Sequence, residues 1–239
     1  MQIPVIDISR FKSADPADRR HVAREWDEAF STIGFATISG HGIPESLLTE
    51  VYDAARAFFA RPLDEKMRIH GRPGVGYEAF QEAKLGQTRG EAAPPDLVEA
   101  LMFANPIWER GPDGDAPDGI NLWPAAPAGF RQTIDRYIDE AYALGQTLTR
   151  ISAIALGLPE RFFDRYYARM THQLRLAHYP DQPEPPLEGQ FRNGPHTDFT
   201  GFTILKQDDA PGGLQVLGPD GMWADVRPIP GTLVINAGD

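Results

Sequence analysis

The chain has 239 residues, which is enough for one large domain or two small ones. It carries 23 Lys and Arg residues against 34 Asp and Glu residues, and the net charge of -11 disfavours binding to nucleic acids and to anionic membrane surfaces. It contains no cysteine, so disulfides, thiolate metal sites, iron–sulfur clusters and a cysteine nucleophile are excluded, and any metal ion must be held by His, Asp or Glu.

No apolar run approaches the roughly 18 residues of a membrane span. A secretory signal has a basic segment followed by a long apolar stretch, and residues 1–7 do not show this pattern. We therefore expect a cytoplasmic protein that has no membrane partner.

The N-terminal part of the chain predicts short strands that alternate with helices. Strands are expected at residues 3–8 and 34–38, where β-branched and other apolar residues gather. Helices are expected at residues 21–30 and 44–59, where apolar residues recur at three- and four-residue steps. His41 lies in a glycine turn between these elements and is expected to be structural.

The remainder of the chain changes from helical to extended patterns. Periodicity fades between residues 71 and 127, and residues 130–155 then predict one long helix. Five strands are expected after it, at residues 173–179, 202–206, 214–217, 222–226 and 232–236. Helices followed by a run of strands indicate an α+β fold rather than alternating βαβ units.

The triplet His196-Thr197-Asp198 is the main candidate for chemistry. On an extended strand, residues i and i+2 point to the same face, so the imidazole and the carboxylate could bind one ion. This pairing of nitrogen and oxygen ligands suits a first-row metal such as Fe(II). By itself, however, the triplet is better explained as a surface turn with an Asp near a His.

Motifs on both sides of the triplet narrow its interpretation. The sequence runs through Gly194-Pro195, the triplet, Gly212-Gly213-Leu214, Asp220-Gly221-Met222-Trp223 and Pro230-Gly231-Thr232-Leu233-Val234-Ile235-Asn236. Nearer the N-terminus stand Ile3-Pro4-Val5-Ile6-Asp7, Gly40-His41-Gly42-Ile43-Pro44 and Pro94-Pro95-Asp96-Leu97. In this order the chain resembles the 2-oxoglutarate- and Fe(II)-dependent oxygenases of the isopenicillin N synthase-like family, and the last motif resembles its bacterial members.

The resemblance implies a jelly-roll core, the double-stranded β-helix shared with cupins, flanked by helices. Residues 1–110 would form an N-terminal α/β region and residues 111–239 a helix and an incomplete jelly-roll oxygenase core, within one structural unit. The family binds iron through a His-x-Asp pair and a distant second His, which makes His196 and Asp198 two of the three ligands. The third ligand, and the Arg-x-Ser motif that binds 2-oxoglutarate, would fall beyond Asp239, so we expect the chain to lack its C-terminal part.

Residues 173–180 resemble the family strand that ends in Tyr-Pro beside 2-oxoglutarate. Alternation places Arg175, Ala177 and Tyr179 on one face of this strand. Tyr179 is expected to bind the cosubstrate, although Ala177 stands where many plant members have Asn. Arg175 needs an anionic partner, which could be a carboxylate of the cosubstrate or substrate, or a structural Asp or Glu.

The resemblance implies an Fe(II)- and 2-oxoglutarate-dependent dioxygenase that uses O2 to hydroxylate a small molecule and releases succinate and CO2. We expect a polar, carboxylate-bearing substrate such as an amino acid or a natural-product intermediate. Three alternatives stay open at this point: a 2-oxoglutarate-independent Fe(II) oxidase or cyclase of the same family, a cupin metal isomerase, and a non-catalytic jelly-roll binding protein. The oligomeric state is not predicted.

Overall fold

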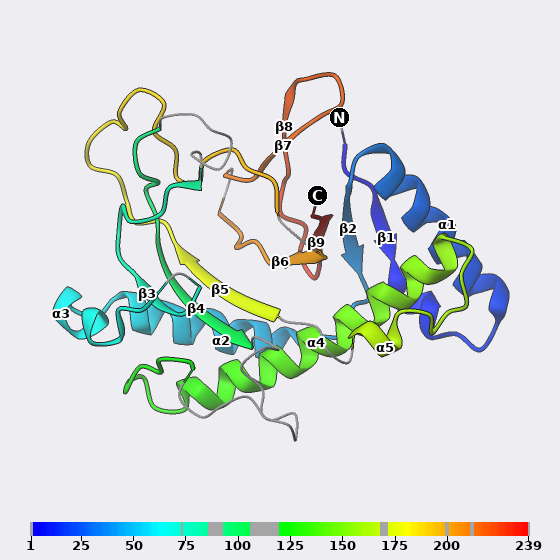
Figure 1. Ribbon diagram of the computed structural model, residues 1–239, viewed down its shortest axis with the longest axis horizontal. Coiled ribbons are helices and arrows are strands. Elements are labelled where there is room, and N and C mark those ends of the chain that lie inside the picture. The colour runs from blue at the N-terminus through cyan, green and yellow to red at the C-terminus, as the bar shows by residue number, and fades with distance from the viewer. Residues whose placement is uncertain are drawn as a thin grey trace. The chain divides into compact units, whose positions relative to one another are not determined.

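The computed structural model describes residues 2–72, 74–85, 93–105, 120–167, 172–198, 201–210 and 213–238 (Figure 1). The chain forms two compact units that alternate along the sequence. Unit 1 comprises Met1–Glu45, Asp139–Ala168 and Thr197–Asp239, and unit 2 comprises Ser46–Ile138 and Arg169–His196.

Unit 1 contains a four-stranded sheet in the order β1-β2-β9-β6. Its strands are β1 (Val5–Asp7), β2 (Phe35–Ser39), β9 (Leu233–Ala237) and β6 (Phe202–Leu205). β1 is parallel to β2, whereas β9 is antiparallel to both of its neighbours. The antiparallel register places Thr203 of β6 opposite Asn236 of β9, so their side chains lie on the same face of the sheet.

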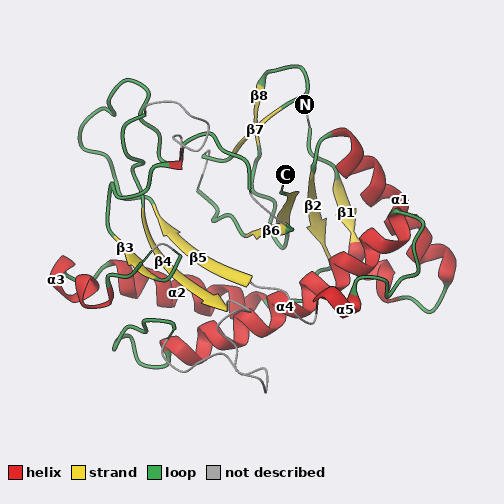
Figure 2. Cartoon of the chain, viewed as in Figure 1, coloured by secondary structure: helices red, strands yellow, loops and turns green. Residues whose placement is uncertain are grey.

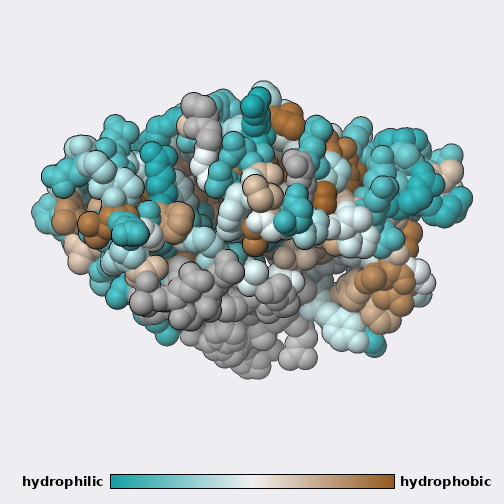
Figure 3. All heavy atoms as spheres, turned by 90° about the horizontal axis from the view of Figure 1, so that it is seen from above, coloured by the Kyte–Doolittle hydropathy of each residue, from teal (hydrophilic) through white to brown (hydrophobic). Residues whose placement is uncertain are grey.

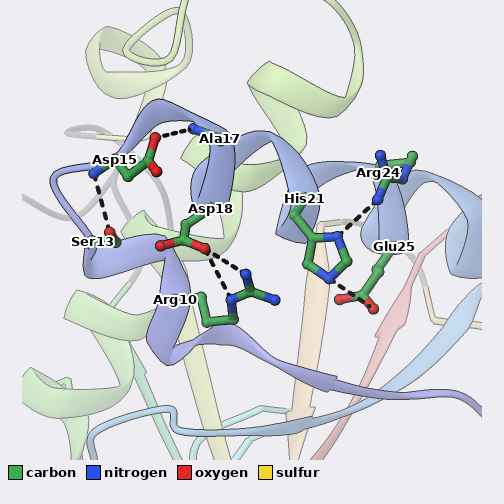
Figure 4. A network of polar contacts seen from close by, with 8 residues as sticks. All are labelled: Arg10, Ser13, Asp15, Ala17, Asp18, His21, Arg24 and Glu25. Carbon is green, nitrogen blue, oxygen red and sulfur yellow. Dashed lines mark hydrogen bonds and ion pairs between the residues drawn. The ribbon is translucent and has the colours of Figure 1, made fainter.

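Helix α1 (Pro16–Thr32) follows the 3-10 helix η1 (Ile8–Lys12) and covers β1 and β2. It begins after Asp15, whose side chain accepts a hydrogen bond from the amide of Ala17 at 2.8 Å, as Figure 4 shows. In the same network Arg10 forms an ion pair with Asp18, and this pair holds the pKa of Asp18 below its usual range. The cap from Asp15 and the negative charge of Asp18 in the first turn explain where helix α1 starts.

Unit 1 also contains α5 (Asp164–Tyr167), the part of α4 (Phe130–Ala155) from residue 139 onward, and a hairpin of β7 (Gln215–Leu217) and β8 (Trp223–Asp225). Val216 and Val226, from the hairpin region, pack with Val234 of β9 in a buried cluster.

Unit 2 contains a three-stranded antiparallel sheet in the order β3-β4-β5. The strands are β3 (Gly76–Glu78), β4 (Glu99–Asn105) and β5 (His172–His178), and the helices are α2 (Glu45–Phe59), α3 (Leu63–Lys66), the 3-10 helix η2 (Met67–Ile69) and the first part of α4. Figure 2 shows α2 alongside this sheet. Aromatic rings pack here, because the ring of Phe58 in α2 lies 5.9 Å from that of Tyr77 in β3 and 6.2 Å from that of Phe130 in α4.

The structure confirms the long helix at residues 130–155 and every predicted strand to within one or two residues at each end. β3 and β4 were not predicted. In β4, Ala100, Leu101, Met102 and Phe103 are all buried, so both faces of the strand are apolar and the alternation that marks a half-buried strand is absent.

Exposed large hydrophobic side chains are spread over several elements of the described chain, among them Leu156, Leu187 and Met222. On the face seen in Figure 3 the hydrophobic areas are separated by hydrophilic residues. Among the described helices, none is long and apolar enough to cross a membrane.

Candidate active site

Arg175 lies in β5 and Tyr179 directly follows this strand, and unit 2 places the two side chains near each other. The positive charge of Arg175 lies close enough to the Tyr179 hydroxyl to act on its pKa. Loss of hydration around this hydroxyl raises the pKa of Tyr179, and the positive charge of Arg175 offsets only part of the increase. Tyr179 remains 39% exposed, so a ligand can reach its ring.

Arg175 also faces a carboxylate that sequence reasoning did not identify. The β3-β4-β5 register brings Glu78 to the face that carries Arg175. The Nη2 atom of Arg175 lies 3.7 Å from Oε2 of Glu78, and the two side chains are 27 and 26% exposed. This distance permits electrostatic attraction but exceeds that of a hydrogen bond. A structural carboxylate is therefore present, without the close bidentate geometry that saturates a guanidinium.

His196 is half-buried, and its ring is oriented by the backbone two residues earlier. Its Nδ1 lies 2.8 Å from the carbonyl oxygen of Gly194. A carbonyl can only accept, so Nδ1 carries the proton and Nε2 carries the lone pair of the neutral ring. This is the tautomer in which Nε2 can bind a metal.

Asp198 is half-buried and is oriented by two side chains of the unit 1 sheet. Its Oδ2 accepts a hydrogen bond from the hydroxyl of Thr203 and another from Nδ2 of Asn236, the latter at 2.7 Å. Both donors come from the register pair that joins β6 to β9. Asn236 stands in the motif of residues 230–236, but the sequence predicts this role for neither Asn236 nor Thr203.

The structure assigns no strand to residues 196–198, so the strand geometry considered for the His-x-Asp pair does not apply to them. The boundary between the units also falls after His196, which places His196 in unit 2 and Asp198 in unit 1. Among the residues that the structure describes, no group of three or more His, Asp or Glu side chains could hold a metal ion. The donor set still fits Fe(II), since it supplies an oriented imidazole and an oriented carboxylate.

A second polar cluster in unit 2 was not predicted and surrounds Glu99, which is 5% exposed. Glu99 accepts hydrogen bonds from Lys66 at 2.7 Å and from the hydroxyl of Tyr77, and its other oxygen lies 2.8 Å from Nδ1 of His178. Burial alone would raise the pKa of Glu99, but these three partners outweigh it and hold the pKa below its usual range. The ring of His178 stacks on Phe59, with the ring centres 5.1 Å apart. His178 is thus engaged with Glu99 and belongs to the packing of unit 2.

Comparisons with known proteins define the class of this chain. Residues 3–126 match the family model described as non-haem dioxygenase in morphine synthesis N-terminal, and residues 170–239 match the model of the 2OG-Fe(II) oxygenase superfamily. A 2-oxoglutarate-Fe(II) type oxidoreductase, hxnY, from Emericella nidulans is 36% identical over 247 residues, which cover 99% of this chain and 69% of the relative. A homoarginine-6-hydroxylase from Oryza sativa subsp. japonica is also 36% identical, over 99% of this chain and 75% of that enzyme.

Solved structures agree with the sequence relatives. The crystal structure of a full-length Neurospora crassa protein in complex with alpha-KG and thymine superposes with a TM-score of 0.83 at 30% identity, and the match covers 99% of this chain and 74% of that one. A putative 2OG-Fe(II) oxygenase family protein from Caulobacter crescentus gives a TM-score of 0.79 at 29% identity, with 99 and 74% of the two chains covered.

The chain therefore belongs to the 2OG-Fe(II) oxygenase superfamily. It is an Fe(II)- and 2-oxoglutarate-dependent oxygenase of small molecules, with an α+β fold and a jelly-roll core, and the resemblance found in the sequence is confirmed. The relatives do not favour the oxidase, isomerase or binding-protein alternatives. The bacterial origin, the missing C-terminal part and the division at residue 110 stay predictions.

Proposed function

We propose that His196 and Asp198 bind Fe(II) in this oxygenase, together with a third ligand, a His expected after Asp239. Tyr179 binds 2-oxoglutarate, and Arg175 binds a carboxylate of the primary substrate. The reaction that we propose is hydroxylation of an amino acid or another small, carboxylate-bearing metabolite. O2 is its second cosubstrate, and the cytoplasm is its location.

The proposal for the metal is supported by what this chain does at each ligand. The Gly194 carbonyl holds the proton of His196 on Nδ1, which leaves the lone pair on Nε2. Thr203 and Asn236 hold one oxygen of Asp198 and so fix the direction of the other. Bound Fe(II), together with 2-oxoglutarate and O2, would supply an oxidant for a C–H bond.

One observation carries the proposal for the substrate, namely the position of Arg175. Its guanidinium lies near Tyr179, which directly follows β5, and is attracted to Glu78 across 3.7 Å without a close hydrogen bond. A substrate carboxylate could therefore take a better-aligned, charge-assisted position on the guanidinium. That four of the relatives are named homoarginine-6-hydroxylases supports an amino acid as the substrate class.

The substrate class can be tested by comparing amino acids with the amines that lack their carboxylate. The full-length protein is supplied with Fe(II) and 2-oxoglutarate, and succinate formation is measured for each member of the panel. We expect succinate formation to be stimulated by an amino acid and not by its matched amine. Equal stimulation by both would contradict the proposed role of Arg175, and oxygen consumption without any dependence on 2-oxoglutarate would contradict the assigned cosubstrate.

Arg175→Met, with Glu78→Gln as the matched control, tests the same site more directly. If Arg175 binds the substrate, its loss weakens substrate binding by roughly 2–4 kcal/mol, whereas Glu78→Gln leaves KM within a few-fold of the wild-type value. If Arg175 only pairs with Glu78, both variants lower the melting temperature by similar amounts and neither changes KM. That second outcome would overturn the proposal.

A further inference from the structure

Asp96 is a buried carboxylate that the proposed chemistry does not use. It belongs to the Pro94-Pro95-Asp96-Leu97 motif and is only 2% exposed. Its Oδ1 accepts a hydrogen bond from the amide of Gly194 at 3.0 Å, and its Oδ2 accepts one from the amide of Leu85 at 2.9 Å. Burying a carboxylate is costly unless its oxygens are hydrogen-bonded, so these two amides explain why Asp96 can stay inside.

Further bonds hold the same two segments of unit 2 together. The amide of Leu97 donates to the carbonyl of Phe191 at 2.9 Å, and Nε2 of Gln190 donates to the carbonyl of Pro95 at 2.9 Å. The segment that precedes His196 is therefore anchored to residues 95–97. Asp96 is the member of this contact whose side chain reaches Gly194.

Gly194 connects Asp96 to His196. Its amide donates to Asp96, and its carbonyl accepts the Nδ1 proton of His196 at 2.8 Å. Fixing the amide restrains the position of this carbonyl, because both groups flank one Cα atom and Pro195 restricts the backbone of the residue before it. The carbonyl in turn selects the tautomer of His196.

We propose that Asp96 is a positioning residue for His196, and that it acts through the Gly194 backbone to keep the imidazole lone pair on Nε2. The inference rests on the proposed function, in which His196 binds the metal. It adds a residue that is 98 positions away from Gly194 in the chain and that reaches the metal ligand through the backbone of Gly194. Removing a residue that orients a metal ligand typically lowers metal affinity by 10- to 100-fold.

The tautomer can be measured without metal or turnover. In the metal-free, full-length protein labelled with 15N-histidine, NMR distinguishes the protonated from the unprotonated ring nitrogen, and His196→Gln assigns the signals. We expect His196 to carry its proton on Nδ1 in the wild type and to show a mixture of tautomers in Asp96→Ala. Mn(II) binding, followed through the EPR signal of the free ion, should weaken about tenfold in the same variant.

Gln190→Ala is the matched control, because it removes a bond between the same two segments and leaves the Gly194 amide in place. We expect this control to keep the wild-type tautomer and Mn(II) affinity. The proposal would be overturned if Gln190→Ala and Asp96→Ala changed the His196 tautomer and the Mn(II) affinity equally. It would also be overturned if a folded Asp96→Ala changed neither quantity. Asp96→Asn, which has only one acceptor oxygen, replaces Asp96→Ala if that variant does not fold.

The wild-type spectrum alone can also overturn the proposal, since a proton on Nε2 of His196 contradicts it whichever variants fold. A failure of the proposed function would give a different result from a failure of the link between Asp96 and His196. In that case the wild type shows the expected tautomer but binds no Mn(II), and the metal site rather than the link from Asp96 is refuted.

Discussion

Two carboxylates, one in each compact unit, are held in contrasting ways. Glu99 in unit 2 is buried and accepts hydrogen bonds from the ammonium group of Lys66, from Tyr77 and from His178. Asp198 in unit 1 is half-buried and accepts hydrogen bonds from the hydroxyl of Thr203 and the amide of Asn236. The partners of Glu99 include a full positive charge, whereas Thr203 and Asn236 contribute direction and no charge.

This difference separates a carboxylate that stabilises the fold from one suited to bind a metal. An ion pair in the interior compensates the cost of burying both charges, and removing either partner leaves the other uncompensated. Neutral donors orient a carboxylate and keep it anionic, which is what a metal ligand requires. Glu99 should therefore matter mainly for stability, and Asp198 mainly for metal binding and turnover.

The largest effect is expected at the metal ligands. Asp198→Ala and His196→Ala should each abolish 2-oxoglutarate turnover, because each removes one of the proposed iron ligands. Their melting temperatures should stay near that of the wild type, since both side chains are only half-buried. Succinate assays and thermal unfolding of the same preparations check both statements. Near-normal turnover in either variant would refute the assignment.

Glu99→Gln is expected to lower the stability of the fold and to leave metal binding largely unchanged. This change leaves the Lys66 ammonium, only 8% exposed, without its carboxylate, and should lower the free energy of unfolding by about 3 kcal/mol. Urea unfolding measures the loss. The double variant Lys66→Met/Glu99→Leu is the control, and it should recover part of the stability because no charge remains buried. A large loss of Mn(II) affinity in folded Glu99→Gln would break the distinction between the two carboxylates.

A smaller effect is expected from the donors that orient Asp198. Thr203→Val removes the hydroxyl without changing the shape of the side chain, and should weaken Mn(II) binding by about tenfold. Thr232→Val is the matched control, because the Thr232 hydroxyl donates to the Ile229 carbonyl at 2.7 Å rather than to Asp198. Equal Mn(II) affinities in the two variants would contradict the role given to Thr203.

The smallest effect concerns His41, which unit 1 keeps neutral, whereas unit 2 keeps Glu99 charged. Burial lowers the pKa of His41 below 6.5, and its Nδ1 accepts a hydrogen bond from the amide of Ile43 at 3.1 Å. In the unfolded chain the His41 imidazole is therefore protonated at a higher pH than in the folded protein. Stability should fall as the pH drops below about 6.5, and His41→Gln should reduce this fall. The prediction would be contradicted if the free energy of unfolding fell by the same amount with decreasing pH in the wild type and in His41→Gln.

Local patterns in the sequence predicted much of the fold. The helix at 130–155 and β5 have clear periods of their own, and the hydrogen bond from the amide of Ile43 to His41 agrees with the structural role expected for this residue. β4 was missed because burial of both its faces removes the alternation that predicts a strand. The motifs on both sides of His196-Thr197-Asp198, taken together with this triplet, identified the class of protein, although these three residues do not form a strand.

The partners of the candidate site could not be predicted in the same way. Glu78 meets Arg175, and Asn236 meets Asp198, only through the registers of strands that are distant in the sequence. The Asp96 motif was visible in the sequence, but its bond to Gly194 depends on how two irregular segments dock. Such contacts depend on tertiary structure and leave no periodic signal.

The most direct test of the central claim is an anaerobic titration of the full-length protein with Fe(II) and 2-oxoglutarate, followed by the visible absorption of 2-oxoglutarate bound to protein-held Fe(II). We expect this absorption to appear only when both Fe(II) and 2-oxoglutarate are present, to persist in Glu99→Gln, and to be lost in His196→Ala and Asp198→Ala. An absorption that survives unchanged in both of those alanine variants would contradict the assignment of His196 and Asp198 as iron ligands.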